Sequence, residues 1–97
     1  MSMSTYNAQR GTITISGDGL YLELDLTVCF PMQDDKLREL IILIDAMPIH
    51  ESVKRQCYKQ MIIYLNQAVN NTEETRYKEL IVVNIIQIKD FIYNQQQ

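Results

Sequence analysis

The chain of 97 residues is long enough for one domain, and its 46% hydrophobic and 22% charged residues are typical of a globular protein rather than a disordered one. A net charge of −3 excludes a general electrostatic attraction to nucleic acids or anionic membranes. The apolar runs fall short of the roughly 20 residues of a membrane span, and the N-terminus lacks the apolar core of a secretion signal. We therefore expect a cytoplasmic protein that binds neither membranes nor nucleic acid.

The first predicted element is a β-hairpin with one buried face. Apolar and polar side chains alternate on both sides of Gly17-Asp18-Gly19, which predicts strands over about 11–16 and 20–30, closed by Pro31. The glycines suit either a phosphate-binding loop or a chain reversal. Because a phosphate loop leads from a strand into a helix, whereas these glycines join two strands, we interpret them as a turn.

Three segments with an apolar period of 3.6 residues follow and predict α-helices over about 34–47, 49–70 and 73–94. Pro48 is expected in the first turn of the second helix. The β-branched run "IVVNIIQI" also suits a strand, but its length and apolar stripe favour the third helix. The expected buried stripes are Leu37, Leu40, Ile41, Ile44 and Met47; Val53, Cys57, Met61, Tyr64, Leu65 and Ala68; and Tyr77, Ile81, Ile85, Ile88 and Ile92.

The predicted fold class is therefore α+β, a hairpin followed by three antiparallel helices. Its single domain is expected over 11–94, with an N-terminal segment over 1–10 and a polar tail over 95–97. The two cysteines, Cys29 and Cys57, form either a disulfide or, as a reducing cytoplasm favours, two free thiols.

Two features predict a homo-oligomer, either a dimer or a higher assembly. Val82, Ile86 and Tyr93 project from the third helix nearly opposite its buried stripe, and the strand over 20–30 is longer than its partner, which leaves an unpaired edge. The alternative is a monomer with a few exposed apolar residues. Asn84 either fixes the register of a helical interface or lies at a solvated boundary.

The leading functional hypothesis is a small, non-enzymatic, homo-oligomeric adaptor or inhibitor-type protein that acts through protein–protein contacts. The polar strand face, together with the unpaired edge, is the expected surface for a protein partner, by addition of a strand. The residues of that face are Tyr21, Glu23, Asp25 and Thr27.

An alternative hypothesis is an oligomeric protein that sequesters or senses a small anionic ligand such as a nucleotide. Arg55 and Lys59 lie one turn apart on the second predicted helix, and Arg10 and Tyr58 are the further candidates for the ligand site. A cationic helix face is also typical of a surface that simply contacts solvent.

The sequence offers no convincing catalytic group. His50 is the single histidine, and no base or orienting partner can be named for Cys29. Glu23 and Asp25 share a strand face at a spacing compatible with paired-carboxylate chemistry, but exposed acidic residues of this kind are typically solubilising. We therefore predict no enzymatic activity, no cofactor and no metal.

Overall fold

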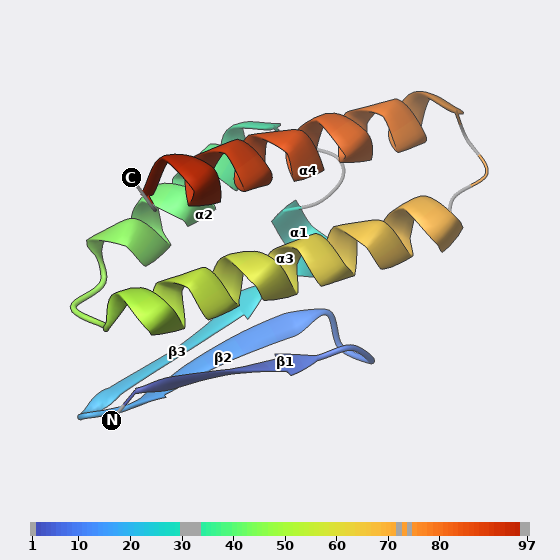
Figure 1. Ribbon diagram of the computed structural model, residues 1–97. Coiled ribbons are helices and arrows are strands. Elements are labelled where there is room, and N and C mark those ends of the chain that lie inside the picture. Colours follow the sequence, from blue (N-terminus) through green and yellow to red (C-terminus); the bar gives the residue numbers. More distant parts are fainter. Residues whose placement is uncertain (1, 30–33, 72, 74, 96–97) are drawn as a thin grey trace.

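The computed structural model describes residues 2–29, 34–71, 73 and 75–95, and has a three-stranded antiparallel sheet followed by helices (Figure 1). In order across the sheet, the strands are β1 (Met3–Asn7), β2 (Thr12–Gly17) and β3 (Leu20–Asp25). The helices are α1 (Leu26–Cys29), α2 (Asp34–Ala46), α3 (Glu51–Asn71) and α4 (Thr75–Gln95). The predicted α+β class is confirmed, and the three long helices begin and end within two residues of their predicted bounds.

The glycine-rich stretch is a two-residue hairpin turn. Asp18 and Gly19 both have positive φ angles, 54° and 80°, and Gly17 pairs with Leu20 across the turn. Positive φ at both central residues is the type I′ geometry, whose twist matches that of the flanking strands. The prediction of a turn rather than a phosphate loop is confirmed, since the chain passes from β2 directly into β3.

The prediction that the second strand extends to residue 30 is wrong, because β3 ends at Asp25 and the chain turns into α1. The Asp25 carboxylate accepts hydrogen bonds from the backbone N–H and the hydroxyl of Thr27, an N-cap arrangement that starts a helix. Leu26 is still fully buried, so the apolar alternation marked a core position correctly although the backbone is helical there. With six residues each, β2 and β3 are equally long.

The segment before residue 11 contributes β1, a strand that the sequence pattern did not predict. It pairs with β2 in antiparallel register, and its inner side chains contact α3. The Tyr6 hydroxyl donates to Gln67 Oε1 at 3.2 Å, and Gln60 Nε2 donates to the Ser4 carbonyl oxygen at 3.4 Å. These contacts, made across about sixty residues of sequence, hold a largely polar strand on the sheet.

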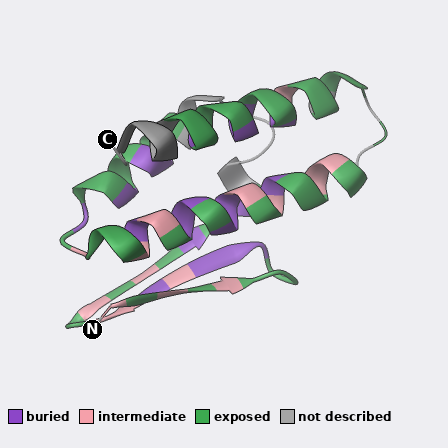
Figure 2. Ribbon diagram, viewed as in Figure 1, coloured by how far each residue is buried: buried purple, intermediate pink, exposed green. Residues whose placement is uncertain are grey.

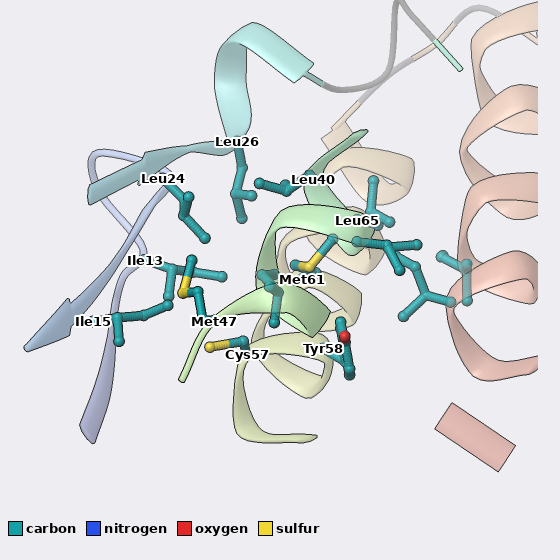
Figure 3. Close-up of a cluster of buried hydrophobic side chains, with 14 of the residues drawn as sticks. Ile13, Ile15, Leu24, Leu26, Leu40, Met47, Cys57, Tyr58, Met61 and Leu65 are labelled. Carbon is teal, nitrogen blue, oxygen red and sulfur yellow. The ribbon is translucent and has the colours of Figure 1, made fainter. Parts of the chain in front are cut away.

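The elements form layers, with α3 packed over the sheet and α4 alongside α3 on the side away from the sheet (Figure 1). The chain measures 42 × 32 × 19 Å, which is a flat shape. Side chains from the sheet, α2 and α3 meet in one core, where Ile13, Ile15 and Leu24 point toward the helices (Figure 3). The buried apolar residues are Ile13, Ile15, Leu24, Leu26, Leu40, Ile41, Ile44, Met47, Cys57, Tyr58, Met61, Leu65, Ile81, Ile85 and Ile88.

The predicted helical stripes are confirmed wherever the structure describes their side chains, each member being buried or half-buried. The side chains of Leu37, Tyr77 and Ile92 lie outside the described residues. Of the two cysteines, Cys57 is a free, buried thiol, and the side chain of Cys29 lies outside the described residues. In this structure Cys57 is not part of a disulfide.

The start of α3 differs from the prediction, because Pro48 lies in the bend before the helix rather than in its first turn. The carbonyl oxygen of His50 accepts hydrogen bonds from the N–H groups of Val53 and Lys54, and its Nδ1 accepts one from the N–H of Ser52. His50 therefore caps α3, with a ring nitrogen in the role that a hydroxyl or carboxylate usually has.

Candidate protein-binding surfaces

The outer face of the sheet carries the polar strand residues predicted to contact a partner. Tyr21 is 70% exposed, and Glu23 and Asp25 are exposed beside it. Thr27 was predicted to share this strand face, but it is exposed in α1 because β3 ends at Asp25. Antiparallel pairing aligns Tyr21 with Ser16 and Glu23 with Thr14 on the same face. In the described part of the chain no helix covers this face, since α3 packs on the other one (Figure 2).

The hairpin turn determines which backbone groups of β3 face the open edge of the sheet. In a two-residue hairpin the residues that flank the turn form a hydrogen-bonded pair, so Leu20 and every second residue after it direct their N–H and C=O groups to β2. The N–H of Leu26 donates to the Gly11 carbonyl oxygen at 2.9 Å, in agreement with this order. The N–H and C=O groups of Tyr21 and Glu23, and the N–H of Asp25, therefore point away from β2, toward the edge, whereas the carbonyl oxygen of Asp25, as the N-cap, belongs to α1.

The two edges of the sheet differ. At the outer edge of β1, the Ser4 carbonyl oxygen accepts the hydrogen bond of Gln60 Nε2, and Gln60 is only 8% exposed. Within the described residues, β3 has β2 as its single hydrogen-bonded neighbour strand. An α3 side chain thus occupies the β1 edge, whereas the β3 edge is open. The sequence predicted an unpaired edge because the second strand was expected to be longer than its partner. The unpaired edge is present at β3, but its reason is that β3 is the outer strand of the sheet.

The outward side of α4 carries an apolar patch. Val82, Val83 and Ile86 are 44%, 46% and 52% exposed, and together we call them the outer face of α4. Three and four residues separate Ile86 from the two valines, so all three side chains lie close together on the helix surface. The opposite side of α4 packs on α3 through Ile81, Ile85 and Ile88. The side chain of Tyr93, predicted to join the outer face, lies outside the described residues.

Asn84 lies on the buried side of α4 and has 0% exposure, so the interpretation as a solvated boundary position is wrong. Among the described residues, neither its Oδ1 nor its Nδ2 has a hydrogen-bond partner. A buried amide without partners is costly, about 1–3 kcal/mol for each group left unpaired. The helix period placed Asn84 near the edge of the stripe, and its polarity gave no signal that the position was covered.

The residues predicted to bind an anion are only partly brought together. Arg55 is half-buried and Lys59 exposed on the same side of α3, but Tyr58 is fully buried in the core. Arg10 precedes Gly11, which packs against Tyr64 nine residues further along α3 than Arg55. At about 1.5 Å per helical residue, nine residues correspond to roughly 13 Å. Arg55 and Lys59 therefore form a cationic pair without the two further candidates.

Lys54, the residue before Arg55, has a structural role. Lys54 is buried, and its ammonium group donates to the Asp45 carbonyl oxygen near the C-terminal end of α2 at 2.5 Å. It also lies 3.6 Å from the Glu51 carboxylate. A cation at this end of a helix compensates the partial negative charge of the last carbonyl groups. Lys54 thus links α2 to α3.

A hollow of about 360 Å³ lies between the first residues of α3 and the β2–β3 turn, lined by Asp18, His50 and Ser52 among others. His50 Nδ1 and the Ser52 hydroxyl oxygen are 2.8 Å apart and share a hydrogen bond. Neither Arg55 nor Lys59 lines this hollow. The hollow and the cationic pair of Arg55 and Lys59 are therefore separate features, and they do not form one anion site together.

Comparison with known proteins gives no relative: no protein-family model matches the chain, and neither a curated protein nor a solved structure is significantly similar to it. Among the described residues, no group of three or more His, Cys, Asp or Glu side chains is placed to hold a metal ion. Over the same residues, each helix is too short or too polar to cross a membrane.

Sequence reasoning missed the contribution of three residues to these surfaces. Val83 belongs to the outer face of α4, and its spacing of three residues from Ile86 was the available signal. Leu20 and Leu22 are only half-buried at the open edge of β3, which single-strand alternation cannot reveal. The direction of the edge backbone, by contrast, follows from the Asp18-Gly19 turn alone.

Proposed function

We propose that this protein is a small, non-enzymatic, cytoplasmic adaptor or inhibitor-type protein that acts through protein–protein contacts as a homodimer. The observation that carries the proposal is the outer face of α4, where three neighbouring aliphatic side chains remain about half exposed on a helix already packed on its other side. Apolar side chains gathered at one place on a small protein typically mark an interaction site. The free thiol of Cys57 is consistent with a reducing compartment.

The charges beside the outer face favour an antiparallel contact between two α4 helices. Lys78 and Glu79 lie toward its N-terminal end, and Lys89 and Asp90 toward its C-terminal end. When two copies cross antiparallel about the level of residue 84, Val82 meets Ile86, Glu79 meets Lys89 and Lys78 meets Asp90. A parallel contact instead brings each charged residue beside its own copy. Opposite charges flanking an apolar centre determine orientation more than affinity.

A charge exchange tests this arrangement. Glu79→Lys or Lys89→Glu alone converts two symmetry-related attractions into repulsions and is expected to weaken dimerisation about three- to tenfold, from roughly 0.2–1 kcal/mol per exposed pair. The double variant Glu79→Lys/Lys89→Glu restores the opposite charges and is expected to restore the affinity. The dissociation constant is measured by sedimentation velocity at low salt.

A parallel contact predicts a different pattern, since Glu79→Lys there exchanges one like-charge pair for another and leaves the affinity unchanged. Full affinity in both single variants, or no recovery in the double variant, would contradict the antiparallel contact. Glu73→Lys, in the connection before α4, is the matched control with the same change of net charge.

The second candidate function is the binding of a small anionic ligand through Arg55 and Lys59. The structure supports it less, because Tyr58 is buried and Arg10 lies beside a distant part of α3. Inorganic phosphate and ATP serve as probes in isothermal titration calorimetry. Binding that the double variant Arg55→Glu/Lys59→Glu abolishes would support an anion site, and the absence of heat at millimolar probe would remove it.

A further inference from the structure

We infer that the open edge of β3 binds an extended segment of a partner protein in which cationic and aliphatic side chains alternate. The inference rests on the proposed function, because it names the partner of an adaptor. An added strand is held by backbone hydrogen bonds, and its side-chain pockets give specificity. Three separate features support the inference. They are the backbone of the edge, the side chains on either side of it, and the charges that disfavour a second copy of this chain.

The backbone of β3 offers a binding edge that runs from Tyr21 to the N–H of Asp25. Tyr21 and Glu23 direct their N–H and C=O groups outward, and Asp25 its N–H, as the type I′ turn and the hydrogen bond from Leu26 to Gly11 require. The other edge of the sheet is already engaged at Ser4 by Gln60 of α3. A partner strand therefore finds its place beside β3.

The side chains along this edge set the pattern that a partner strand needs. On the outer face, Glu23 and Asp25 present two carboxylates beside the exposed ring of Tyr21. On the inner face, Leu20 and Leu22 are half-buried at the margin of the core. An antiparallel strand places alternate side chains on these two faces. Cations on its outer side pair with the carboxylates, and aliphatic side chains on its inner side cover the leucines.

The same charges discriminate against a second copy of this chain. An antiparallel β3–β3 pair that engages all three outward residues places Glu23 directly opposite Glu23 of the other copy. A shift toward the C-terminal end places Glu23 opposite Asp25. Like charges directly opposite each other on one sheet face are destabilising. Charged residues on an edge strand are a common protection against edge-to-edge association. The carboxylates thus leave the edge available to a cationic strand.

The test uses a synthetic eight-residue peptide of alternating lysine and valine, with binding followed by fluorescence anisotropy of a labelled peptide. In the antiparallel register, the lysine residues lie opposite the outward residues of β3 and make the backbone hydrogen bonds. N-methylation of the lysine residues is therefore expected to abolish binding, whereas N-methylation of the valine residues leaves it within about twofold. A peptide of alternating glutamate and valine is expected not to bind.

Variants of the protein test the same edge from the other side. Glu23→Lys is expected to weaken binding about tenfold, since it turns a cross-strand attraction into a repulsion and repels the neighbouring lysines as well. Glu23→Pro removes an N–H that points away from β2 and is expected to weaken binding equally while keeping the native circular dichroism spectrum. Glu73→Lys, remote from the sheet, is the matched control and is expected to bind like the unmodified protein.

Three results would overturn the inference: no binding of the lysine–valine peptide, equal binding of the glutamate–valine peptide, or loss of binding on methylation of the valine residues instead of the lysines. Sedimentation of the same samples separates this inference from the proposed dimer. A dimer that does not bind the peptide overturns the inference alone. A monomer that binds it overturns the proposed dimer and supports the open edge.

Discussion

The Asp25 carboxylate accepts hydrogen bonds from both the backbone N–H and the hydroxyl of Thr27, at 3.0 and 2.6 Å. This local motif ends β3 and begins α1, so it fixes the length of the open sheet edge. It also gives Asp25 a structural role beside its exposed position on the strand face. Glu23, two residues earlier on the same face, has no such role in the described structure.

Replacement of Asp25 by alanine is therefore expected to lower the free energy of unfolding by about 1 kcal/mol, the usual effect of removing an N-cap acceptor. Asp25→Asn keeps an acceptor oxygen and is expected to lose less. Urea unfolding measures the difference, and Glu23→Ala serves as the matched control, with a change near zero. A loss in Glu23→Ala as large as in Asp25→Ala would contradict the capping role.

At Asn84, in contrast to Asp25, a substitution is expected to stabilise the protein. Leucine has the same branching and the same number of side-chain heavy atoms, and it leaves no unpaired polar group between α4 and α3. Asn84→Leu is expected to raise the free energy of unfolding by about 1–3 kcal/mol. The control is Asn66→Leu on the exposed side of α3, expected to change little. Destabilisation by Asn84→Leu would mean that the amide has a hydrogen-bonding partner in solution.

Gly11 and Gly19 form a matched pair because both have positive φ angles, 67° and 80°. A Cβ at Gly11 would lie 2.7 Å from Thr27 Cγ2 and 3.1 Å from Tyr64 Cε2, whereas a Cβ at Gly19 meets nothing within 4 Å. Alanine at either position costs about 1–2 kcal/mol for the left-handed backbone. Gly11→Ala is expected to cost about 1–3 kcal/mol more through overpacking. Equal losses of thermal stability in the two variants would contradict the close packing at Gly11.

Cys57 makes stability depend on pH in the alkaline range. Burial raises the pKa of the Cys57 thiol, so the folded protein keeps this proton at a pH where the unfolded chain, with a thiol pKa of about 8.5, releases it. The stabilisation is complete below that pH and is lost as the pH rises through the folded pKa. Between pH 8 and 10, urea unfolding is expected to show a steeper loss of stability than in Cys57→Ala. Parallel pH profiles would contradict a buried neutral thiol.

Much of the fold is predictable from local patterns. The alternation around Gly17 to Gly19 and the 3.6-residue stripes of the helices each involve residues close in sequence, so the pattern itself carries the information. The strand β1 was missed because it has few apolar residues and is held by Tyr6–Gln67 and Ser4–Gln60, contacts between distant segments. The end of β3 was missed because apolar alternation continues through Leu26, while the cap at Asp25 decides the backbone.

The surfaces were predictable in part for the same reason. The exposure of Glu23 follows from its polarity and the period of the strand, and that of Ile86 follows from its position opposite the buried stripe of the helix. Both side chains are exposed in the structure. The burial of Tyr58, Lys54 and Asn84 depends on how α2, α3 and α4 pack, which a single helical wheel does not contain. The separation of Arg10 from Arg55 likewise depends on where the β1–β2 turn meets α3.

The most direct test of the proposed homodimer is sedimentation equilibrium of the unmodified chain over a hundredfold range of concentration. A homodimer predicts a mass that rises from 11.4 kDa toward twice that value, and an Ile86→Glu variant that remains at 11.4 kDa. Ile63→Glu, at a similarly exposed position on α3 beside Lys59, is expected to dimerise like the unmodified chain. A constant mass of 11.4 kDa at every concentration, or a dimer that Ile86→Glu leaves intact, would contradict association through the outer face of α4.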